Sequence, residues 1–256
     1  MEEKKRSTDI QSIGRVLQLF DLLAEGAAMG VIDISKELGV TRTAIYSLIA
    51  PLLKASYLEK DEESGKYRLG YKFYELGKQY RHHYPFTAIA ETYARQLSRK
   101  TRLQVNMAVF KAPSTIVLII SADITEQIKQ EPQPVVSAHV SSCGKVLLAS
   151  LDEKMLDEAI ASIEFLNYTA NTIMDGETLR KELEEVRRLG YATEKGELFS
   201  SKGCIGAPVR GAGGKTLAAL SVDGELTDIE SRFEELRDLV VSTAAELSRE
   251  LGYKMK

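Results

Sequence analysis

Three side chains of the types that carry nucleophilic catalysis lie close together in the sequence: His139, Ser141 and Ser142. A serine hydroxyl becomes a nucleophile when an imidazole takes its proton, and such a pair would support hydrolysis. However, the chain contains no Gly-x-Ser-x-Gly turn of the kind that presents a serine in many hydrolases. Nearness in sequence also does not place an imidazole within hydrogen-bond distance of a hydroxyl. The sequence therefore does not predict an enzyme.

A glycine-rich segment, Gly211 to Thr216, is superficially similar to a loop that binds phosphate groups. That pattern requires a further glycine five residues before Gly214, and Val209 occupies the position. The residues after Thr216, Leu-Ala-Ala-Leu-Ser-Val, are typical of a strand rather than of a helix that caps a phosphate. We interpret the segment as a glycine-rich hairpin.

Two cysteines, Cys143 and Cys204, and three histidines cannot be arranged in the spacing of a zinc finger. No apolar segment follows the basic residues near the N-terminus, so no secretory signal is predicted. The thiols are then expected to be reduced and the protein cytoplasmic. The longest aliphatic run, 116–120, is far shorter than the ~20 residues of a membrane helix, so no membrane partner is expected.

The composition is that of an ordinary folded protein, since 44% of the 256 residues are hydrophobic and 28% are charged. This length corresponds to one large domain or two ordinary ones. The 34 basic and 37 acidic residues give a net charge of −3, which argues mildly against nucleic acid as a partner. A small DNA-binding surface can still lie in a weakly acidic chain.

The N-terminal part of the sequence predicts three short helices followed by a hairpin. Residues 1–11 are polar and are expected to form a flexible tail. Gly39 can end the second helix in a left-handed conformation, and Thr41 can cap the third. The order of elements is that of a winged helix-turn-helix, predicted for residues 12–70. The predicted helices begin near residues 12, 32 and 42, and the predicted strands are 57–60 and 66–69.

In a helix-turn-helix the second helix of the pair lies in the major groove of DNA. Residues 1–80 contain 12 basic and 12 acidic side chains, which indicates a weak grip on phosphates by each subunit. The same three-helix unit is also common as a packing or dimerisation module, and these residues alone leave that alternative open. The residues expected to contact DNA are Thr41, Arg42, Thr43, Tyr46 and Ser47 on the third helix and Lys66 and Arg68 on the hairpin.

The rest of the chain predicts a linking helix over 71–84 and a second domain over 85–256. Its helices and strands do not alternate strictly, which favours an α+β fold in which an antiparallel sheet has helices on one face. The predicted helices are 86–99, 142–149, 153–162, 176–189 and 228–251, and the predicted strands lie near 104–110, 115–121, 135–140, 191–193, 204–210 and 216–223.

Several segments, in order, resemble the IclR family of bacterial transcription regulators. The resemblance covers nearly the whole chain. It implies a winged helix-turn-helix followed by a C-terminal GAF-like effector-binding domain with an antiparallel sheet, assembled as a homodimer or homotetramer. The segments are 12–23, 34–39, 57–61 and 64–70 in the N-terminal part, and 139–149, 203–209 and 217–222 downstream.

The chain departs from the family pattern in and after the third helix. Many members have arginine at the position of Ser47, and members usually have glycine at that of Ser56. Pro51 is unusual, because a proline inside a helix loses a backbone hydrogen bond and costs ~3 kcal/mol. We expect a kink or an early end of this helix near Ala50, and a modest affinity for DNA.

The resemblance also implies a small-molecule pocket in the C-terminal domain. Members that bind small carboxylates often have hydroxyl residues at the last two of its positions, and Asp223 departs from this. Two acids around the pocket disfavour a plain dicarboxylate, so an effector with an amine, hydroxyls or a bound cation is expected. The implied positions are Ser142, Cys143 and Gly144, where a helix N-terminus can hold an anion, and Glu194, Cys204, Ser221 and Asp223 opposite them.

A metal site built from Cys143, Cys204, Glu194, Asp223 and His139 is an alternative, although their spacing matches no metal motif. We expect instead that the cysteines are small buried hydrophobes and that His139 is a hydrogen-bonded strand residue. On this interpretation the protein needs neither a metal nor another cofactor.

The sequence is interpreted as that of a non-enzymatic transcription regulator, a repressor, which binds double-stranded operator DNA. A small-molecule effector in the C-terminal domain would control its affinity for DNA. The alternatives are a metal- or ligand-binding GAF-like module with hydrolytic activity, and an architectural DNA-binding protein without effector control.

Overall fold

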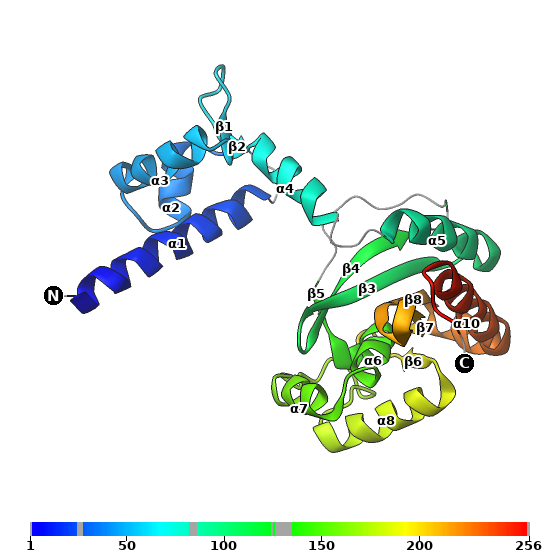
Figure 1. Ribbon diagram of the computed structural model, residues 1–256. Coiled ribbons are helices and arrows are strands. Elements are labelled where there is room, and N and C mark those ends of the chain that lie inside the picture. The colour runs from blue at the N-terminus through cyan, green and yellow to red at the C-terminus, as the bar shows by residue number, and fades with distance from the viewer. Residues whose placement is uncertain (1, 25–27, 82–85, 124, 126–134, 255–256) are drawn as a thin grey trace. The chain divides into compact units, whose positions relative to one another are not determined.

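The chain folds into two compact units, residues 1–85 and 86–256. The computed structural model describes residues 2–24, 28–81, 86–123, 125 and 135–254, and the two units are described separately (Figure 1). Within these residues no helix is both long and apolar enough to cross a lipid bilayer.

The first unit is a winged helix-turn-helix, as predicted. β1 and β2 pair antiparallel, and Met29 forms an additional bridge to Tyr67 of β2. Gly39 has a φ of 62°, and the hydroxyl of Thr41 accepts a hydrogen bond from the backbone of Ala44 at 3.3 Å, so the predicted turn and cap are present. The elements are α1 (Glu2–Ala24), α2 (Val31–Glu37), α3 (Arg42–Lys54), β1 (Leu58–Lys60), β2 (Tyr67–Leu69) and α4 (Tyr71–Arg81).

One apolar core holds this unit together. It forms because each helix presents an apolar stripe at helical spacing to the same interior. Burial of these side chains, at about 25 cal/mol per Å², is the main stabilisation of a unit this small. The buried members are Leu19, Leu23, Ile34, Ile45, Ile49, Leu58 and Tyr67.

Two predictions for this unit differ from the structure: the N-terminal tail and the early end of the third helix near Ala50. α1 begins at Glu2, so the residues expected to form a tail, 2–11, belong to the helix. Glu, Lys and Arg, which dominate this part of the sequence, are good helix formers. α3 does not end near Ala50 but continues through Pro51 to Lys54. A proline removes only its own N–H from the helix, and Leu52 beyond it packs against the core.

The second unit is built on a six-stranded sheet with the order β5-β4-β3-β8-β7-β6. All neighbouring strands are antiparallel, so the predicted α+β class is confirmed. The elements are α5 (Thr87–Thr101), β3 (Gln104–Ala112), β4 (Thr115–Ala122), β5 (Val135–Ser137), α6 (Ser142–Ala149), α7 (Glu153–Ala161), α8 (Gly176–Leu189), β6 (Ala192–Lys195), β7 (Lys202–Arg210), β8 (Thr216–Glu225), α9 (Leu226–Ser231) and α10 (Phe233–Glu250).

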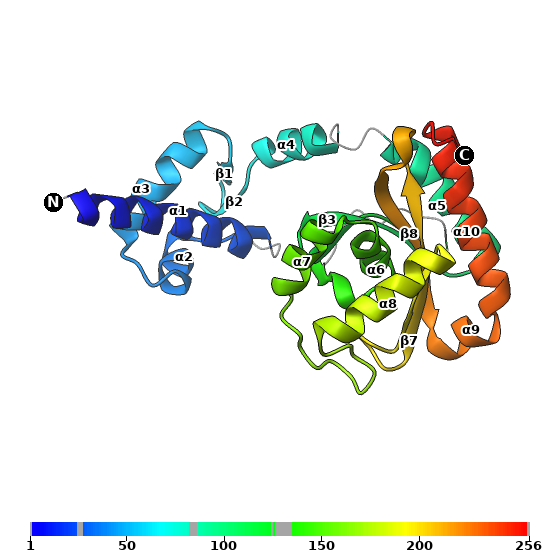
Figure 2. The ribbon, with the colours of Figure 1, turned by 60° about the horizontal axis from the view of Figure 1, so that its bottom comes forward.

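Helices cover both faces of the sheet, whereas one covered face was predicted. α5 and α10 pack on one face, and α6, with α8 beyond it, packs on the other (Figure 2). Consecutive residues along β7 and β8 are therefore buried, whichever face their side chains occupy. A strand buried on both sides has a nearly continuous apolar run instead of alternation. The segment 217–222 has such a run.

The predicted helix over 228–251 is in fact two helices, because the chain leaves the helical conformation at Arg232. The Arg232 guanidinium donates to the carbonyl oxygen of Thr101 at 3.0 Å, which ties the break to the end of α5. On either side of the break, Ile229 and Leu236 are buried. The glycine-rich segment 211–214 is a tight connection between β7 and β8, as interpreted, with positive φ at Gly213 and Gly214.

Candidate functional site

The exposed face of α3 carries the helix residues that were predicted to contact DNA. On the opposite face, Ile45 and Ile49 are buried in the core. The ring of Tyr46 is 56% exposed, so it is accessible on this face. The hydroxyl of Ser47 donates to the carbonyl oxygen of Thr43 at 3.1 Å, so it remains able only to accept from DNA. The exposed residues of this face are Thr41, Arg42, Thr43, Tyr46 and Ser47.

Lys66 and Arg68 are exposed on the β1–β2 hairpin. Arg68 is held by Glu59, whose Oε2 accepts hydrogen bonds from Nε at 3.2 Å and lies 3.2 Å from Nη2. The other oxygen of Glu59 accepts from the backbone of Tyr71 at 3.0 Å. The charge of Arg68 is therefore partly neutralised and fixed in place. No acidic side chain in the described part of the chain pairs with Arg42.

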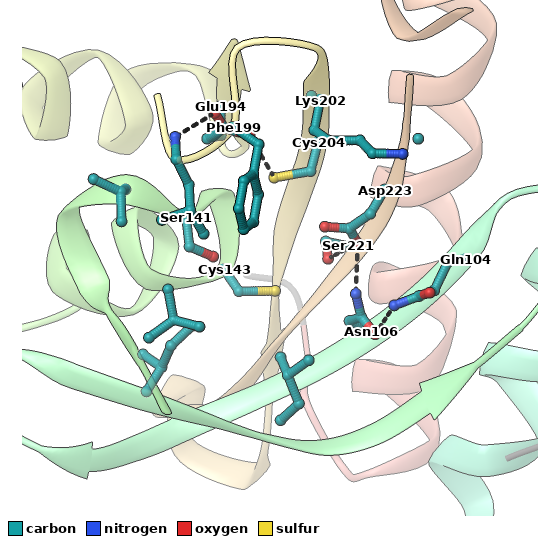
Figure 3. Close-up of a pocket in the computed structure, with 17 residues that line it drawn as sticks. Gln104, Asn106, Ser141, Cys143, Glu194, Phe199, Lys202, Cys204, Ser221 and Asp223 are labelled. Atoms are coloured by element: carbon teal, nitrogen blue, oxygen red, sulfur yellow. Dashed lines mark hydrogen bonds between the residues drawn. The ribbon is translucent and has the colours of Figure 1, made fainter. Parts of the chain in front are cut away.

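The second unit encloses a cavity of about 310 Å³ between the sheet and the start of α6 (Figure 3). One wall is polar and comes mainly from β3, β6, β7 and β8. The other wall is apolar and comes from β4, β5, the residues after β5 and the loop after β6. The polar residues are Gln104, Asn106, Ser141, Glu194, Lys202, Ser221 and Asp223, with both cysteine thiols, and the apolar ones include Ile116, Leu118, Val136, Val140, Leu198 and Phe199.

Strand register brings four of the polar-wall residues into one row across the sheet. Gln104 of β3 is paired with Asp223 of β8, and Asp223 is also paired with Cys204 of β7. Cys204 is in turn paired with Glu194 of β6. Because paired residues of antiparallel strands project to the same face, the four side chains lie side by side on the floor of the cavity.

Asp223 accepts two hydrogen bonds on one carboxylate oxygen. Oδ2 accepts from Asn106 Nδ2 at 2.9 Å and from the Ser221 hydroxyl at 2.8 Å. The amide of Gln104 donates to Asn106 Oδ1 at 3.1 Å and so orients the Asn106 side chain. Burial raises the pKa of Asp223, and these two donors oppose the rise.

Glu194 is occupied by protein donors on both of its oxygens. Oε1 accepts from the backbone N–H groups of Glu197 and Leu198, in the loop that follows β6. Oε2 lies 3.7 Å from the Cys204 thiol, which donates to it. Burial raises the pKa of Glu194, and the hydrogen bonds from the backbone of Glu197 and Leu198, with the charge of Lys145, oppose the rise. Glu194 therefore anchors the loop that carries Leu198 and Phe199 along the cavity.

The cysteines are buried and neutral, as expected. Cys143 is 1% and Cys204 5% exposed, and no disulfide joins them. His139 lies apart from the lining residues: its Nδ1 is hydrogen-bonded to the Ser137 hydroxyl at 2.8 Å, and its ring packs edge-on against Phe165. Among the described residues, no three His, Cys, Asp or Glu side chains are arranged to hold a metal ion.

Two residues expected to face the pocket do not line the cavity. Gly144 packs so closely on the chain at Ala138 that an added Cβ would lie 2.1 Å from the carbonyl oxygen. The hydroxyl of Ser142 is fully buried beside Gly206. Both residues shape the start of α6, while Ser141 and Cys143 reach the cavity.

Sequence reasoning missed the β3 side of the cavity, Gln104 and Asn106. A signal for them existed, because two polar side chains two positions apart interrupt an otherwise apolar strand and must share one face. Lys202 and Phe199 were also missed. They lie near the cavity mouth, where the side chain of Lys202 is 51% exposed and pairs with Glu225.

A winged helix-turn-helix joined to a separate sheet unit with a cavity of this kind defines the class of helix-turn-helix transcription regulators. Residues 12–62 match the IclR helix-turn-helix domain, and residues 78–249 match the C-terminal domain of bacterial IclR transcriptional regulators. The chain belongs to the IclR family.

Several curated relatives and solved structures are similar to this chain over nearly its whole length. The transcriptional regulator XynR of Escherichia coli K12 is 28% identical over 95% of this chain and 98% of its own length. The transcriptional repressor AllR of the same organism is 28% identical over 95% and 91%. The IclR structure from Thermotoga maritima has a TM-score of 0.80 at 24% identity and covers 95% of this chain and 100% of that one. An IclR homologue from Microbacterium hydrocarbonoxydans, in complex with 4-hydroxybenzoate, has a TM-score of 0.79 at 21% identity and covers 95% and 98%.

Proposed function

We propose that this protein is a repressor that binds double-stranded operator DNA through α3 and the β1–β2 hairpin. The exposed face of α3 supports this, since polar and aromatic side chains occupy the positions that enter the major groove. We assign Arg42, Thr43, Tyr46 and Ser47 to the groove, with Thr41 at the helix start, and Lys66 and Arg68 to the DNA backbone. The relative AllR is named as a repressor.

We propose further that a small molecule in the cavity controls DNA affinity. The observation that carries this proposal is the cavity itself, since about 310 Å³ lies at the lower end of the size range of ligand sites, about 300–1,000 Å³. A homologue of the same fold was crystallised with 4-hydroxybenzoate. The residues assigned to the ligand are Cys143, Glu194, Cys204, Ser221 and Asp223, together with Asn106 and Ser141, while Ser142 and Gly144 support the helix start.

In this proposal residues 12–70 bind DNA, 71–84 link the units, and 85–256 bind the effector and hold subunits together. Two-fold operators need two recognition helices about one turn of DNA apart, so a homodimer or homotetramer is required. An effector that binds one arrangement of the C-terminal units more tightly shifts the protein toward that arrangement. The change in DNA affinity can be no larger than the effector's difference in affinity for the two arrangements.

The hydrolytic alternative has no support. The His139 ring contacts the hydroxyl of Ser137, and neither Ser141 nor Ser142 is hydrogen-bonded to it among the described contacts. The curated relatives are named as transcriptional regulators.

The test uses operator DNA selected by the full-length protein from a random-sequence pool. Replacing Arg42 with alanine should weaken binding in a gel shift at least about fivefold, because one good contact to a base is worth ~1–3 kcal/mol. Lys111→Ala, which removes an exposed positive charge from the C-terminal unit, is the matched control. Unchanged binding by Arg42→Ala would show that the groove face is assigned wrongly.

Effector control is tested with metabolites that raise the melting temperature of the purified protein. A stabilising compound should also change the affinity for the selected DNA. If Glu194→Gln and Asp223→Ser both leave its thermal shift unaltered, the compound binds outside the cavity and the pocket assignment fails.

A further inference from the structure

The two acids of the cavity differ in how much hydrogen-bonding capacity they can offer to a ligand. Both oxygens of Glu194 are engaged, by two backbone N–H groups and by the Cys204 thiol. On Asp223, the donors Asn106 and Ser221 converge on Oδ2 alone. The Cys204 thiol also interacts with the Asp223 carboxylate, but it is a weak donor with a single proton, and Glu194 Oε2 lies 3.7 Å from the same sulfur. Oδ1 of Asp223 is thus the strongest acceptor left for a ligand.

The charges around the cavity also disfavour a negatively charged ligand group beside Asp223. Lys202 is the one cationic side chain among the lining residues of the described cavity, and its ammonium group is paired with Glu225 at the mouth. The buried Lys145 is paired with Glu197 and Glu182. Among the described residues, no positive charge therefore remains inside to balance a carboxylate placed beside Asp223, and two like charges at that distance repel each other strongly.

In the described part of the chain, the portion of the opposite wall formed by β4 and β5 presents apolar side chains. Ile116 of β4 and Val136 of β5 are neighbours in the register of the two strands, and Leu118 lies two residues further along β4 on the same face. A ligand that extends from Asp223 across the cavity therefore meets polar groups at one end and apolar side chains at the other (Figure 3).

We propose that the cavity selects a small amphipathic ligand that donates a hydrogen bond to Asp223, from a primary amine or a hydroxyl group, and places an apolar ring or chain against Ile116, Leu118 and Val136. A carboxylate at the Asp223 end is excluded. Affinity follows the order amine, then alcohol, then carboxylate. This inference rests on the proposed function only in taking the cavity as a ligand site.

The order is tested with three probes that share one ring and differ in one group: benzylamine, benzyl alcohol and benzoate. Their affinities for the full-length protein are measured without DNA by ligand-observed NMR titration at pH 7.5. Benzylamine should bind about tenfold or more tightly than benzoate, because a charge-assisted hydrogen bond replaces a repulsion, and benzyl alcohol should lie between them. Preference for benzoate, equal affinities, or no binding of any probe would overturn the proposal.

Variants separate the role of Asp223 from general charge effects. Asp223→Asn keeps the shape and should abolish the preference for benzylamine over benzyl alcohol. Asp223→Ser, which restores a hydroxyl residue, should bind benzoate at least as tightly as benzylamine. Glu230→Gln removes an acid from the exposed surface of α9 and should keep the original order. If the order survives Asp223→Ser, or is lost in Glu230→Gln, Asp223 does not select the ligand.

One further variant tests whether the probes bind in the cavity. Leu118→Trp fills the apolar end and should weaken the binding of all three probes, and unaltered binding would overturn the proposal. Thermal unfolding of each variant verifies that it is folded. Since DNA is absent from these measurements, loss of DNA binding would contradict the proposed function without affecting this result, and the reverse also holds.

Discussion

Burial sets the ionisation of the nucleophilic and basic side chains near the cavity. It raises the pKa of Cys143 to about 12 and holds that of Cys204 well above its usual value, so both thiols stay protonated at neutral pH. Burial, with a smaller contribution from the charge of Lys145, lowers the pKa of His139 to about 4. A protonated thiol is a poor nucleophile and a poor metal ligand. The cysteines therefore serve as small apolar residues.

The neutral state of His139 makes the stability of the protein sensitive to acid. The pKa of this group is about 4 in the folded protein and 6.5 in the reference state, so the unfolded chain takes up the proton first as the pH falls. The free energy of unfolding should decrease between pH 6.5 and pH 4, by about 3 kcal/mol when the effect is complete. Chemical denaturation of the wild type and of His139→Gln at pH 7 and pH 4.5 measures this loss.

The comparison isolates His139, because the carboxyl groups titrate in the same range in both proteins. His139→Gln should lose clearly less stability than the wild type between the two pH values. An equal loss in both proteins would mean that the folded state accommodates the imidazolium ion.

Ser56 is held in a conformation that suits glycine. Its φ is 60°, in the left-handed region, where a Cβ atom costs roughly 1–2 kcal/mol. Gly70 packs against the same residue so closely that an added Cβ would lie 2.3 Å from the Ser56 carbonyl oxygen, which fixes the local chain path. Ser56→Gly should raise the free energy of unfolding by about 1 kcal/mol in chemical denaturation. Ser56→Ala keeps the Cβ atom and serves as the control, so equal stability of the two variants would refute this explanation.

At the scale of elements, the end of a helix could be predicted from the local sequence wherever a capping side chain or a glycine marks it. α8 spans 176–189, as predicted, because the Asp175 carboxylate caps its first turn and Gly190 leaves it with a φ of 79°. Ends that depend on tertiary packing were not predictable in this way. α3 passes Pro51 because apolar residues beyond it reach the core, and the break at Arg232 depends on a carbonyl group of α5.

The residues of the cavity, like the ends of the helices, were predictable from the sequence only where they do not depend on tertiary contacts. Family resemblance indicated positions on β6, β7 and β8, and Glu194, Cys204, Ser221 and Asp223 all line the cavity. The polar positions of β3 are visible in the local sequence, but their place in the cavity is not, because the pairing of β3 with β8 joins residues more than 100 positions apart. Without that pairing, Asn106 has no visible connection to Asp223.

The loop after β6 is tied to α6 by a buried ion pair. Lys145 is 1% exposed, and its ammonium group lies 2.6 Å from Glu197 and 3.0 Å from the carbonyl oxygen of Thr193. Lys145→Met has a side chain of similar length without the charge, and it leaves the Glu197 carboxylate buried and uncompensated. The free energy of unfolding should fall by about 3–5 kcal/mol in chemical denaturation.

Two further variants test whether the buried pair is the cause. The double variant Lys145→Met, Glu197→Gln should recover a large part of the loss, because no unpaired charge remains. Lys181→Met removes the exposed pair with Glu177 on α8 and should change stability by less than about 1 kcal/mol. A double variant no more stable than Lys145→Met would contradict the assignment.

For the molecule as a whole, the near-neutral charge divides into a DNA-binding part and a more acidic remainder. Residues 1–80 contain 12 basic and 12 acidic side chains, which leaves 34 − 12 = 22 basic and 37 − 12 = 25 acidic residues elsewhere. Within the first unit the exposed cations proposed to contact DNA are Arg42 on α3 and Lys66 and Arg68 on the hairpin, and Glu59 partly neutralises Arg68. The DNA interface proposed for one subunit thus offers few phosphate contacts, and the proposed homodimer or homotetramer would multiply them.

The salt dependence of DNA binding is therefore expected to increase with the number of subunits bound to the operator. Each phosphate contact contributes ~0.9 to the slope of log affinity against log salt concentration. Lys66→Ala removes one proposed contact from each subunit, so the magnitude of the slope should fall by about 2 for a dimer and by about 1 for a monomer. Fluorescence anisotropy titrations between 50 and 200 mM salt measure it, with sedimentation as an independent measure of assembly and Lys111→Ala as the charge-matched control. If the slope is the same for Lys66→Ala as for the wild type, Lys66 of the hairpin does not contact a DNA phosphate.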